Sequence, residues 1–191
     1  MTNLDKIRAR LKDQIERPLR ERQARGRFGE LIVEAWLKQR CMEVQPLPQD
    51  IGTKHLLLPE GGKRPDFAVA FSPEDGVFFV DAKLHNTNDL KQFSLESDEI
   101  EDFRSAMRQL AVDVLLIALV PRERVDRLYL IGLNEIAEDN EFGAAGLFNL
   151  DHANDQWFIG HISKEDYESA LARLKREGFT ADVPSYPDAH E

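Results

Sequence analysis

The chain has 191 residues and a formal net charge of −10, with 25 Lys and Arg against 35 Asp and Glu. This length fits one globular domain with a short extension. No apolar run approaches the roughly 18 residues of a membrane span, and the charged start of the chain contains no signal-peptide core. We therefore expect a cytoplasmic protein with no membrane partner. Cys41 is the only cysteine, which excludes an intrachain disulfide and a cysteine-rich zinc site.

The amino-terminal segment has the opposite charge to the rest of the chain. Between Lys6 and Arg27, nine basic residues stand against three acidic ones, a local charge of +6, so the remaining residues sum to −16. Such a segment could bind phosphate groups while the acidic remainder keeps the protein in solution. The same pattern is also typical of a solvated helix face with i,i+4 ion pairs. Both interpretations stay open on the sequence alone.

Apolar residues at helical spacing predict one helix before Pro18 and, after a break at this proline, a second helix over residues 28–40. The second helix is apolar on two sides, so we expect it to be largely buried. Glu30 and Glu34 lie one turn apart on it, where a carboxylate without a partner would be unfavourable. A metal ion, an arginine or a hydrogen-bond network must compensate their charges.

A strand is predicted over 42–47, and residues 67–71 and 77–80 predict an antiparallel hairpin around a Pro-Glu-Asp-Gly turn. In that hairpin Asp66, at the start of the first strand, lies opposite Asp81 and Lys83, at the end of the second. Side chains alternate along a strand, so Asp81 and Lys83 share one face and Ala82 points away. Two carboxylates and an ammonium group therefore converge, which suits phosphodiester hydrolysis with Mg2+.

The second half of the chain alternates between helix and strand patterns. Ser97 is a candidate N-cap for a helix through Leu110, and the unbroken apolar run 114–120 predicts a central strand covered on both faces. A strand over 128–133, a short helix over 134–140 and an edge strand over 157–162 follow. Ser163 then caps a helix that ends before Gly178, and the tail from 181 is predicted to be disordered. The order of elements predicts an α/β fold of three layers with a mixed central sheet.

Three short motifs lie in a fixed order within residues 25–133: Gly26-Arg27-Phe28-Gly29-Glu30, Arg64-Pro65-Asp66 and Val80-Asp81-Ala82-Lys83. Together they resemble the PD-(D/E)XK nuclease superfamily, whose restriction-endonuclease-like fold includes archaeal Holliday-junction resolvases. Each motif alone is weak, since Pro-Asp recurs at 187–188 and Asp-x-Lys at 89–91. The resemblance implies a restriction-endonuclease-like α/β/α core over 25–180, a basic helical extension over 1–24 and a tail over 181–191.

The resemblance also implies a function, namely Mg2+-dependent hydrolysis of DNA phosphodiester bonds with Mn2+ as a substitute metal. The expected catalytic residues are Glu30, Asp66, Asp81 and Lys83. Asp66, Asp81, the carbonyl of Ala82 and Glu30 would hold the metal, and Lys83 would orient or deprotonate the attacking water. DNA is the expected partner, and many members of the superfamily act as homodimers. The residues predicted to contact nucleic acid are Arg20, Arg22, Arg25, Arg27, Lys63, Arg64 and His85.

Two functions of other kinds stay open. The chain could be a catalytically inactive nuclease-fold module that binds nucleic acid, or an acidic interaction protein that binds a basic protein partner. The net charge of −10 counts against the enzyme, because DNA-binding surfaces are usually basic, and an acidic surface suits a basic protein partner. The intact set of Glu30, Asp66, Asp81 and Lys83 favours the enzyme. Metal-dependent cleavage separates the three functions.

Overall fold

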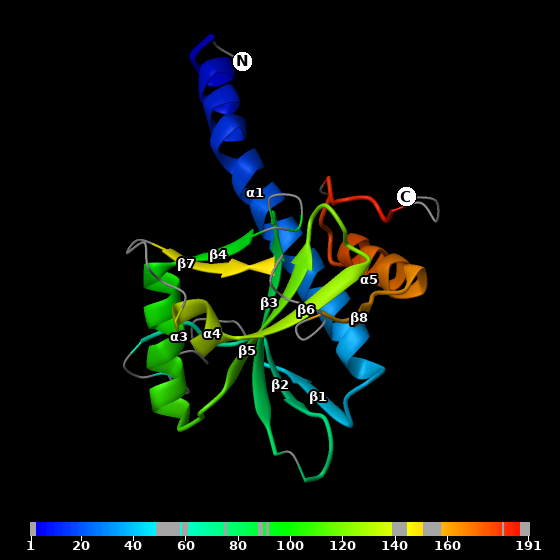
Figure 1. Cartoon of the computed structure of the whole chain (residues 1–191). Coiled ribbons are helices and arrows are strands. Elements are labelled where there is room, and N and C mark those ends of the chain that lie inside the picture. The colour runs from blue at the N-terminus through cyan, green and yellow to red at the C-terminus, as the bar shows by residue number, and fades with distance from the viewer. Residues whose placement is uncertain are drawn as a thin grey trace.

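The computed structural model describes residues 3–48, 58, 61–74, 76–87, 90, 92–138, 145–150, 158–180 and 182–187, with side chains from residue 16 onward except 137–138, 145–149 and 158. A mixed sheet lies at its centre with helices on both faces (Figure 1). In chain order the elements are α1 (Asn3–Lys38), β1 (Glu43–Pro46), β2 (Phe67–Ala70), β3 (Phe78–His85), β4 (Gln92–Glu96), α3 (Ser97–Leu110), β5 (Leu115–Pro121), β6 (Arg127–Gly132), α4 (Leu133–Glu138), β7 (Ala145–Asn149), β8 (Phe158–His161) and α5 (Lys164–Arg176).

The central sheet has six strands in the order β1-β2-β3-β5-β6-β8. β3 and β5 run parallel, and every other neighbouring pair in this sheet is antiparallel. Ala118 and Val120 of β5 pack in a core with α1 and α5 on one face, whereas Ile117 and Leu119 pack with α3 and α4 on the other. Because both faces of β5 are covered, its sequence is apolar throughout. The predicted three-layer α/β fold with a mixed central sheet is confirmed.

The predicted hairpin is also present, with β2 and β3 antiparallel and Phe67 opposite Val80. β3 is longer than predicted and continues to His85 because it pairs with β5 along its whole second half. Asp81 and Lys83 therefore lie inside this strand rather than at its end. A second, two-stranded sheet of β4 and β7, which the sequence did not predict, lies beside α3.

The helix α1 runs without interruption through Pro18, so the predicted break at this residue is wrong. Pro18 is exposed, so water can bind the carbonyl that loses its hydrogen bond, and ion pairs of 3.0 Å join Glu16 to Arg20 and Arg17 to Glu21 across the proline. The amino-terminal turns of α1 project beyond the sheet in Figure 1, and the buried second half packs on it as predicted. The predicted division between residues 24 and 25 falls inside this helix.

Two further predictions need correction. Glu96 is the N-cap of α3, and Ser97 is its first helical residue, with a buried hydroxyl that has no hydrogen-bond partner among the described atoms. The predicted disorder from 181 is wrong for residues 182–187, because tyrosines hold them on α5. Tyr186 Oη donates to the Ile162 carbonyl at 2.9 Å, and Tyr167 Oη donates to the Pro184 carbonyl at 2.9 Å. None of the described helices combines the length and apolar character needed to cross a membrane.

Candidate active site

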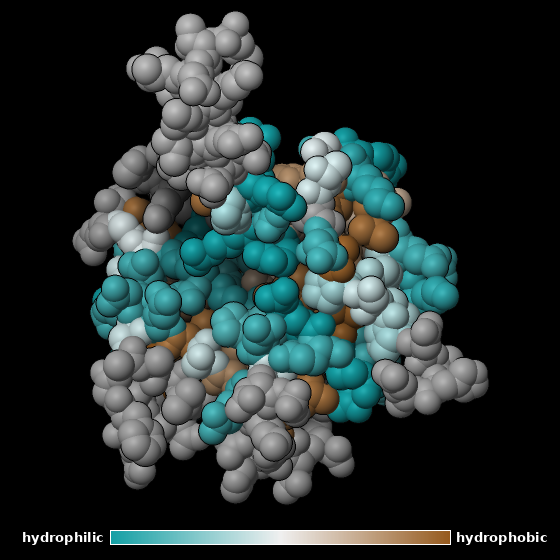
Figure 2. Space-filling view, turned by 90° about the horizontal axis from the view of Figure 1, so that it is seen from above, coloured by the Kyte–Doolittle hydropathy of each residue, from teal (hydrophilic) through white to brown (hydrophobic). Residues whose placement is uncertain are grey.

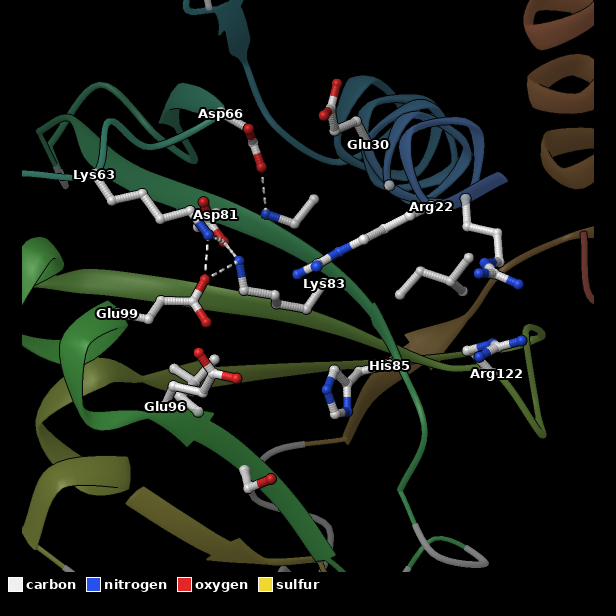
Figure 3. Close-up of a pocket in the computed structure, with 16 residues that line it drawn as sticks. Arg22, Glu30, Lys63, Asp66, Asp81, Lys83, His85, Glu96, Glu99 and Arg122 are labelled. Carbon is white, nitrogen blue, oxygen red and sulfur yellow. Dashed lines mark hydrogen bonds and ion pairs between the residues drawn. The ribbon is translucent and has the colours of Figure 1, made fainter. Parts of the chain in front are cut away.

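A pocket of about 780 Å3 lies among α1, β3, β4, the amino-terminal turn of α3 and the turn after β5. Its lining includes Glu30, Asp66, Asp81, Ala82 and Lys83, so the fold brings all the predicted catalytic residues to one cavity. Figure 2 shows a hollow surrounded by hydrophilic side chains on the face from which the amino-terminal part of α1 projects. Figure 3 shows the lining residues.

The pocket opens where the pairing of β2 with β3 ends. The Asp66 backbone N–H donates to the Val80 carbonyl at 3.0 Å, and the next strand N–H, that of Ala82, donates to Asp66 Oδ2 at 2.8 Å. The Asp66 side chain thus satisfies a strand donor that would otherwise need a ladder partner. This bond fixes its carboxylate at the edge of β3, next to Asp81.

Asp81 forms the buried floor of the site, with a relative exposure of 0%. Its Oδ2 contacts Lys83 Nζ and lies 3.9 Å from Lys63 Nζ. Its Oδ1 has no hydrogen-bond partner among the described residues. A buried carboxylate oxygen without a partner is unfavourable, because it has lost its hydration without compensation. A bound cation would compensate this oxygen.

Glu99, from the first turn of α3, joins the two lysines. Its carboxylate contacts Lys63 Nζ and accepts from Lys83 Nζ at 3.0 Å. Both ammonium groups also lie over the Phe103 ring, at 4.9 Å for Lys63 and 5.3 Å for Lys83. Glu99 is not among the residues that the sequence predicts for the site. One sequence signal indicates its position: Glu99 stands four residues before the buried Phe103, so both side chains lie on the helix face that packs toward β3.

Glu30 lies on the opposite wall, carried by α1. The close packing of α1 on β3 depends on Gly29, since a Cβ there would lie 2.8 Å from the Leu84 Cβ. Glu30 Oε2 accepts from Arg27 Nη1 at 2.7 Å, and Figure 3 shows its carboxylate turned away from Asp81. Within the described ranges, no three Asp, Glu, His or Cys side chains lie close enough to hold one metal ion. In this structure Arg27 compensates the charge of Glu30.

The pKa shifts show that burial disfavours the charged form of Asp66, Asp81 and Glu30. Burial and the charges of Asp81 and Glu30 raise the pKa of Asp66 well above its usual value. Burial also raises the pKa of Asp81, although Lys83 opposes this, and it raises the pKa of Glu30 against the effect of Arg27. For Lys83 burial acts to lower the pKa, but the Asp81 and Glu99 carboxylates outweigh it and raise the pKa. Such a set of hard oxygen donors fits a divalent cation.

The residues predicted to contact nucleic acid are divided between the pocket and the rest of the molecule. Arg27 is bound to Glu30 and Glu177, and Arg20 to Glu16. Arg64 is 4% exposed, which removes it from the surface. The pocket wall contains Arg22, Arg25, Lys63 and His85, together with Arg122, which the sequence analysis did not single out.

Comparisons with known proteins give a likeness to a solved structure. No protein-family model matches the chain, and no curated protein matches its sequence. Among solved structures, Hjc, a Holliday junction resolvase from the archaeal hyperthermophile Archaeoglobus fulgidus, aligns with 12% sequence identity and a TM-score of 0.43. The alignment covers 66% of this chain and 84% of that one. We draw no conclusion about activity from a likeness of this size.

Proposed function

We propose that the protein is a Mg2+-dependent nuclease that hydrolyses DNA phosphodiester bonds in this pocket. The observation that supports the proposal most is the position of Asp66 and Asp81 on paired strands, with Lys83 on the same strand face as Asp81. Carboxylates are the ligands that Mg2+ prefers, and the buried Asp81 Oδ1 has no hydrogen-bond partner in the described part of the chain.

The metal ligands in this proposal are Asp66, Asp81 and the carbonyl of Ala82, with Glu30 contributing after it separates from Arg27. Mn2+ would substitute for Mg2+ because it accepts the same oxygen ligands. When bound, the ion supplies positive charge that polarises the phosphate and stabilises the leaving oxygen. The lysines compensate only part of the negative charge of these carboxylates, so the site favours a cation.

Lys83 acts in this proposal as a hydrogen-bond donor. The neighbouring Asp81 and Glu99 raise its pKa above the usual value, although burial acts in the other direction, so the amine is protonated at neutral pH. A protonated amine cannot accept the proton of water. Lys83 therefore orients the attacking water or a phosphate oxygen, with Glu99 fixing the position of its ammonium group.

Cleavage of labelled duplex, single-stranded and four-way-junction DNA with Mg2+ or Mn2+ tests the proposal. We expect cleavage by the wild type, and its loss in Asp81→Asn, in Lys83→Met and in EDTA. Asp98→Asn is the matched control, since Asp98 is an exposed acid in the first turn of α3 that does not line the pocket. The metal should also raise the melting temperature of the wild type but not that of Asp81→Asn.

A second candidate function is binding of nucleic acid without cleavage. The ammonium groups of Lys63 and Lys83 lie against Asp81 and Glu99, so the two lysines compensate the charges of these carboxylates. Binding to DNA with no cleavage of any substrate, and no metal-induced rise in melting temperature, would overturn the nuclease proposal in favour of this function.

A further inference from the structure

The pocket has two chemically different ends. Asp66, Asp81 and Glu99 lie at one end, together with the two lysines that partly neutralise them. The lining also contains Arg22 and Arg25 from α1 and Arg122 from the turn after β5. Figure 3 shows Arg22 reaching from α1 over β3, and Arg122 beyond His85 at the side opposite Lys63.

Among the described side chains, these three arginines have no acidic partner. Several other arginines of the described chain are bound to carboxylates, such as Arg124 to Asp126 at 2.9 Å and Arg173 to Glu34 at 2.9 Å. No carboxylate of the described side chains lies within 4.0 Å of Arg22, Arg25 or Arg122. In a chain with ten more acidic than basic residues, three neighbouring arginines without a counter-charge indicate a place for an external anion.

Arg122 is held firmly at this place. Its backbone N–H donates to the His85 carbonyl at 2.9 Å, and the preceding Pro121 is paired with His85 in the sheet. The side chain is partly buried, and its Nε has no hydrogen-bond partner among the described atoms. Arg25 and Arg122 also line a second cavity of about 320 Å3, together with Glu123 and Asp182, so the surface at this end continues past the first pocket.

The separation of the two ends suits a nucleic-acid strand. His85 lies four positions after Asp81 on β3, about 13 Å away at a rise of roughly 3.3 Å per residue. A nucleic-acid strand carries one phosphate per nucleotide, so a strand that follows this length brings more than one phosphate to the pocket. A strand with its reacting phosphate near Asp81 would place other phosphates beside the arginines.

We infer that Arg22, Arg25 and Arg122 form a phosphate-binding subsite that holds the substrate strand a few nucleotides from the carboxylates. Guanidinium groups bind phosphate oxygens through paired, charge-assisted hydrogen bonds, which makes arginine well suited to this role. This inference rests on the proposed function, which gives the position of the reacting phosphate. Phosphate binding by the arginines needs no metal, whereas cleavage does, so an experiment can test the subsite and the nuclease activity separately.

The test measures fluorescence anisotropy of a labelled single-stranded oligonucleotide in EDTA with the full chain. We expect Arg25→Gln and Arg122→Gln each to raise Kd about tenfold, because each removes a charge-assisted contact. Arg122→Lys, which keeps the charge, should restore part of the affinity. The control is Arg20→Gln, which removes an arginine of the same helix that is bound to Glu16 and lies outside this pocket. Unchanged melting temperatures would show that the variants are folded.

The outcomes separate the subsite from the enzyme. Equal affinity in Arg25→Gln, Arg122→Gln and Arg20→Gln, or no binding by the wild type, overturns the subsite even when the wild type cleaves DNA. Arginine-dependent binding without cleavage by the wild type supports the subsite while the nuclease proposal fails. A requirement for a 5′-phosphate on the oligonucleotide assigns the subsite to a terminal phosphate, and equal binding of the 5′-hydroxyl form assigns it to backbone phosphates.

Discussion

Replacement of Gly29 by alanine tests how the sequence brings Glu30 to the pocket. A Cβ at this position would lie 2.8 Å from the Leu84 Cβ and 3.3 Å from the Leu84 backbone nitrogen. Nonbonded carbon atoms prefer about 3.5–4.0 Å, and overpacking of this kind costs about 1–3 kcal/mol. Alanine is favoured over glycine inside a helix by about 1 kcal/mol. Because strand atoms, rather than a flexible side-chain end, must move, we expect a net loss of about 1–2 kcal/mol.

Gly26 provides the matched control for Gly29→Ala one turn earlier on the same helix. A Cβ at Gly26 meets nothing within 4 Å, so Gly26→Ala should keep the helix gain and stabilise the protein by about 0.5–1 kcal/mol. Urea unfolding measures both variants. Gly29→Ala should also lower cleavage, since α1 must move away from β3 and carries Glu30 with it. Equal stability of the two variants would refute the close contact between α1 and β3.

Three further substitutions test the charges of the molecule. Burial and neighbouring acids raise the pKa of Asp66, so its ionised form destabilises the folded state at neutral pH. Asp66→Asn should therefore raise the free energy of unfolding in EDTA by about 1–2 kcal/mol. The same substitution should abolish cleavage. A lower melting temperature would contradict the expected stabilisation. Glu99→Gln should lower single-turnover cleavage by about 10–100-fold with DNA affinity unchanged, because Lys83 loses its orienting partner; an unaltered rate would remove Glu99 from the site. Burial acts to raise the pKa of Glu34, but Lys38 and Arg173 outweigh it and lower the pKa. A carboxylate with a folded pKa below its unfolded one, about 4.3 for Glu, stabilises the protein above that pH and loses this contribution as the pH falls through its folded pKa. Glu34→Gln should therefore lower the free energy of unfolding by about 1 kcal/mol at pH 7 and by less at pH 4. Urea unfolding at both pH values measures this difference. An equal loss at both pH values would contradict the lowered pKa of Glu34.

The sequence predicts those parts of the fold in which the residue pattern of one short segment is enough to specify its structure. The run 114–120 is apolar on both strand faces and therefore indicates a strand between two layers. Ser163 accepts from the Asp166 backbone N–H at 3.1 Å and caps α5 as its spacing predicts. The hairpin that carries Asp66 and Asp81 is predicted for the same reason, since both strands and the turn lie within a short stretch.

The parts that the sequence does not predict depend on contacts between distant segments. β4 pairs with β7, some fifty residues later in the chain, and no local pattern specifies that ladder. The positions of Lys63 and Glu99 depend on how the segment before β2 packs on α3, where the Lys63 backbone N–H donates to the Asp102 carbonyl at 3.1 Å. Pro18 misled the prediction because a helix-breaking residue is tolerated where its freed carbonyl is hydrated.

The net charge of −10 is an argument against binding nucleic acid only if charge is spread evenly over the molecule, and here it is not. Carboxylates of the body are paired with cations, as Glu34 is with Lys38 and Arg173. Burial and neighbouring acids raise the pKa of Asp66, and burial raises the pKa of Asp81, so the ionised form of each carboxyl is unfavourable in the folded protein. The arginines without acidic partners face the same pocket. A phosphate strand would thus meet guanidinium groups first, and the carboxylates would repel it until a cation is bound. On the proposed function, the local order of charges, rather than their sum, would make metal and nucleic acid cooperative ligands of this pocket.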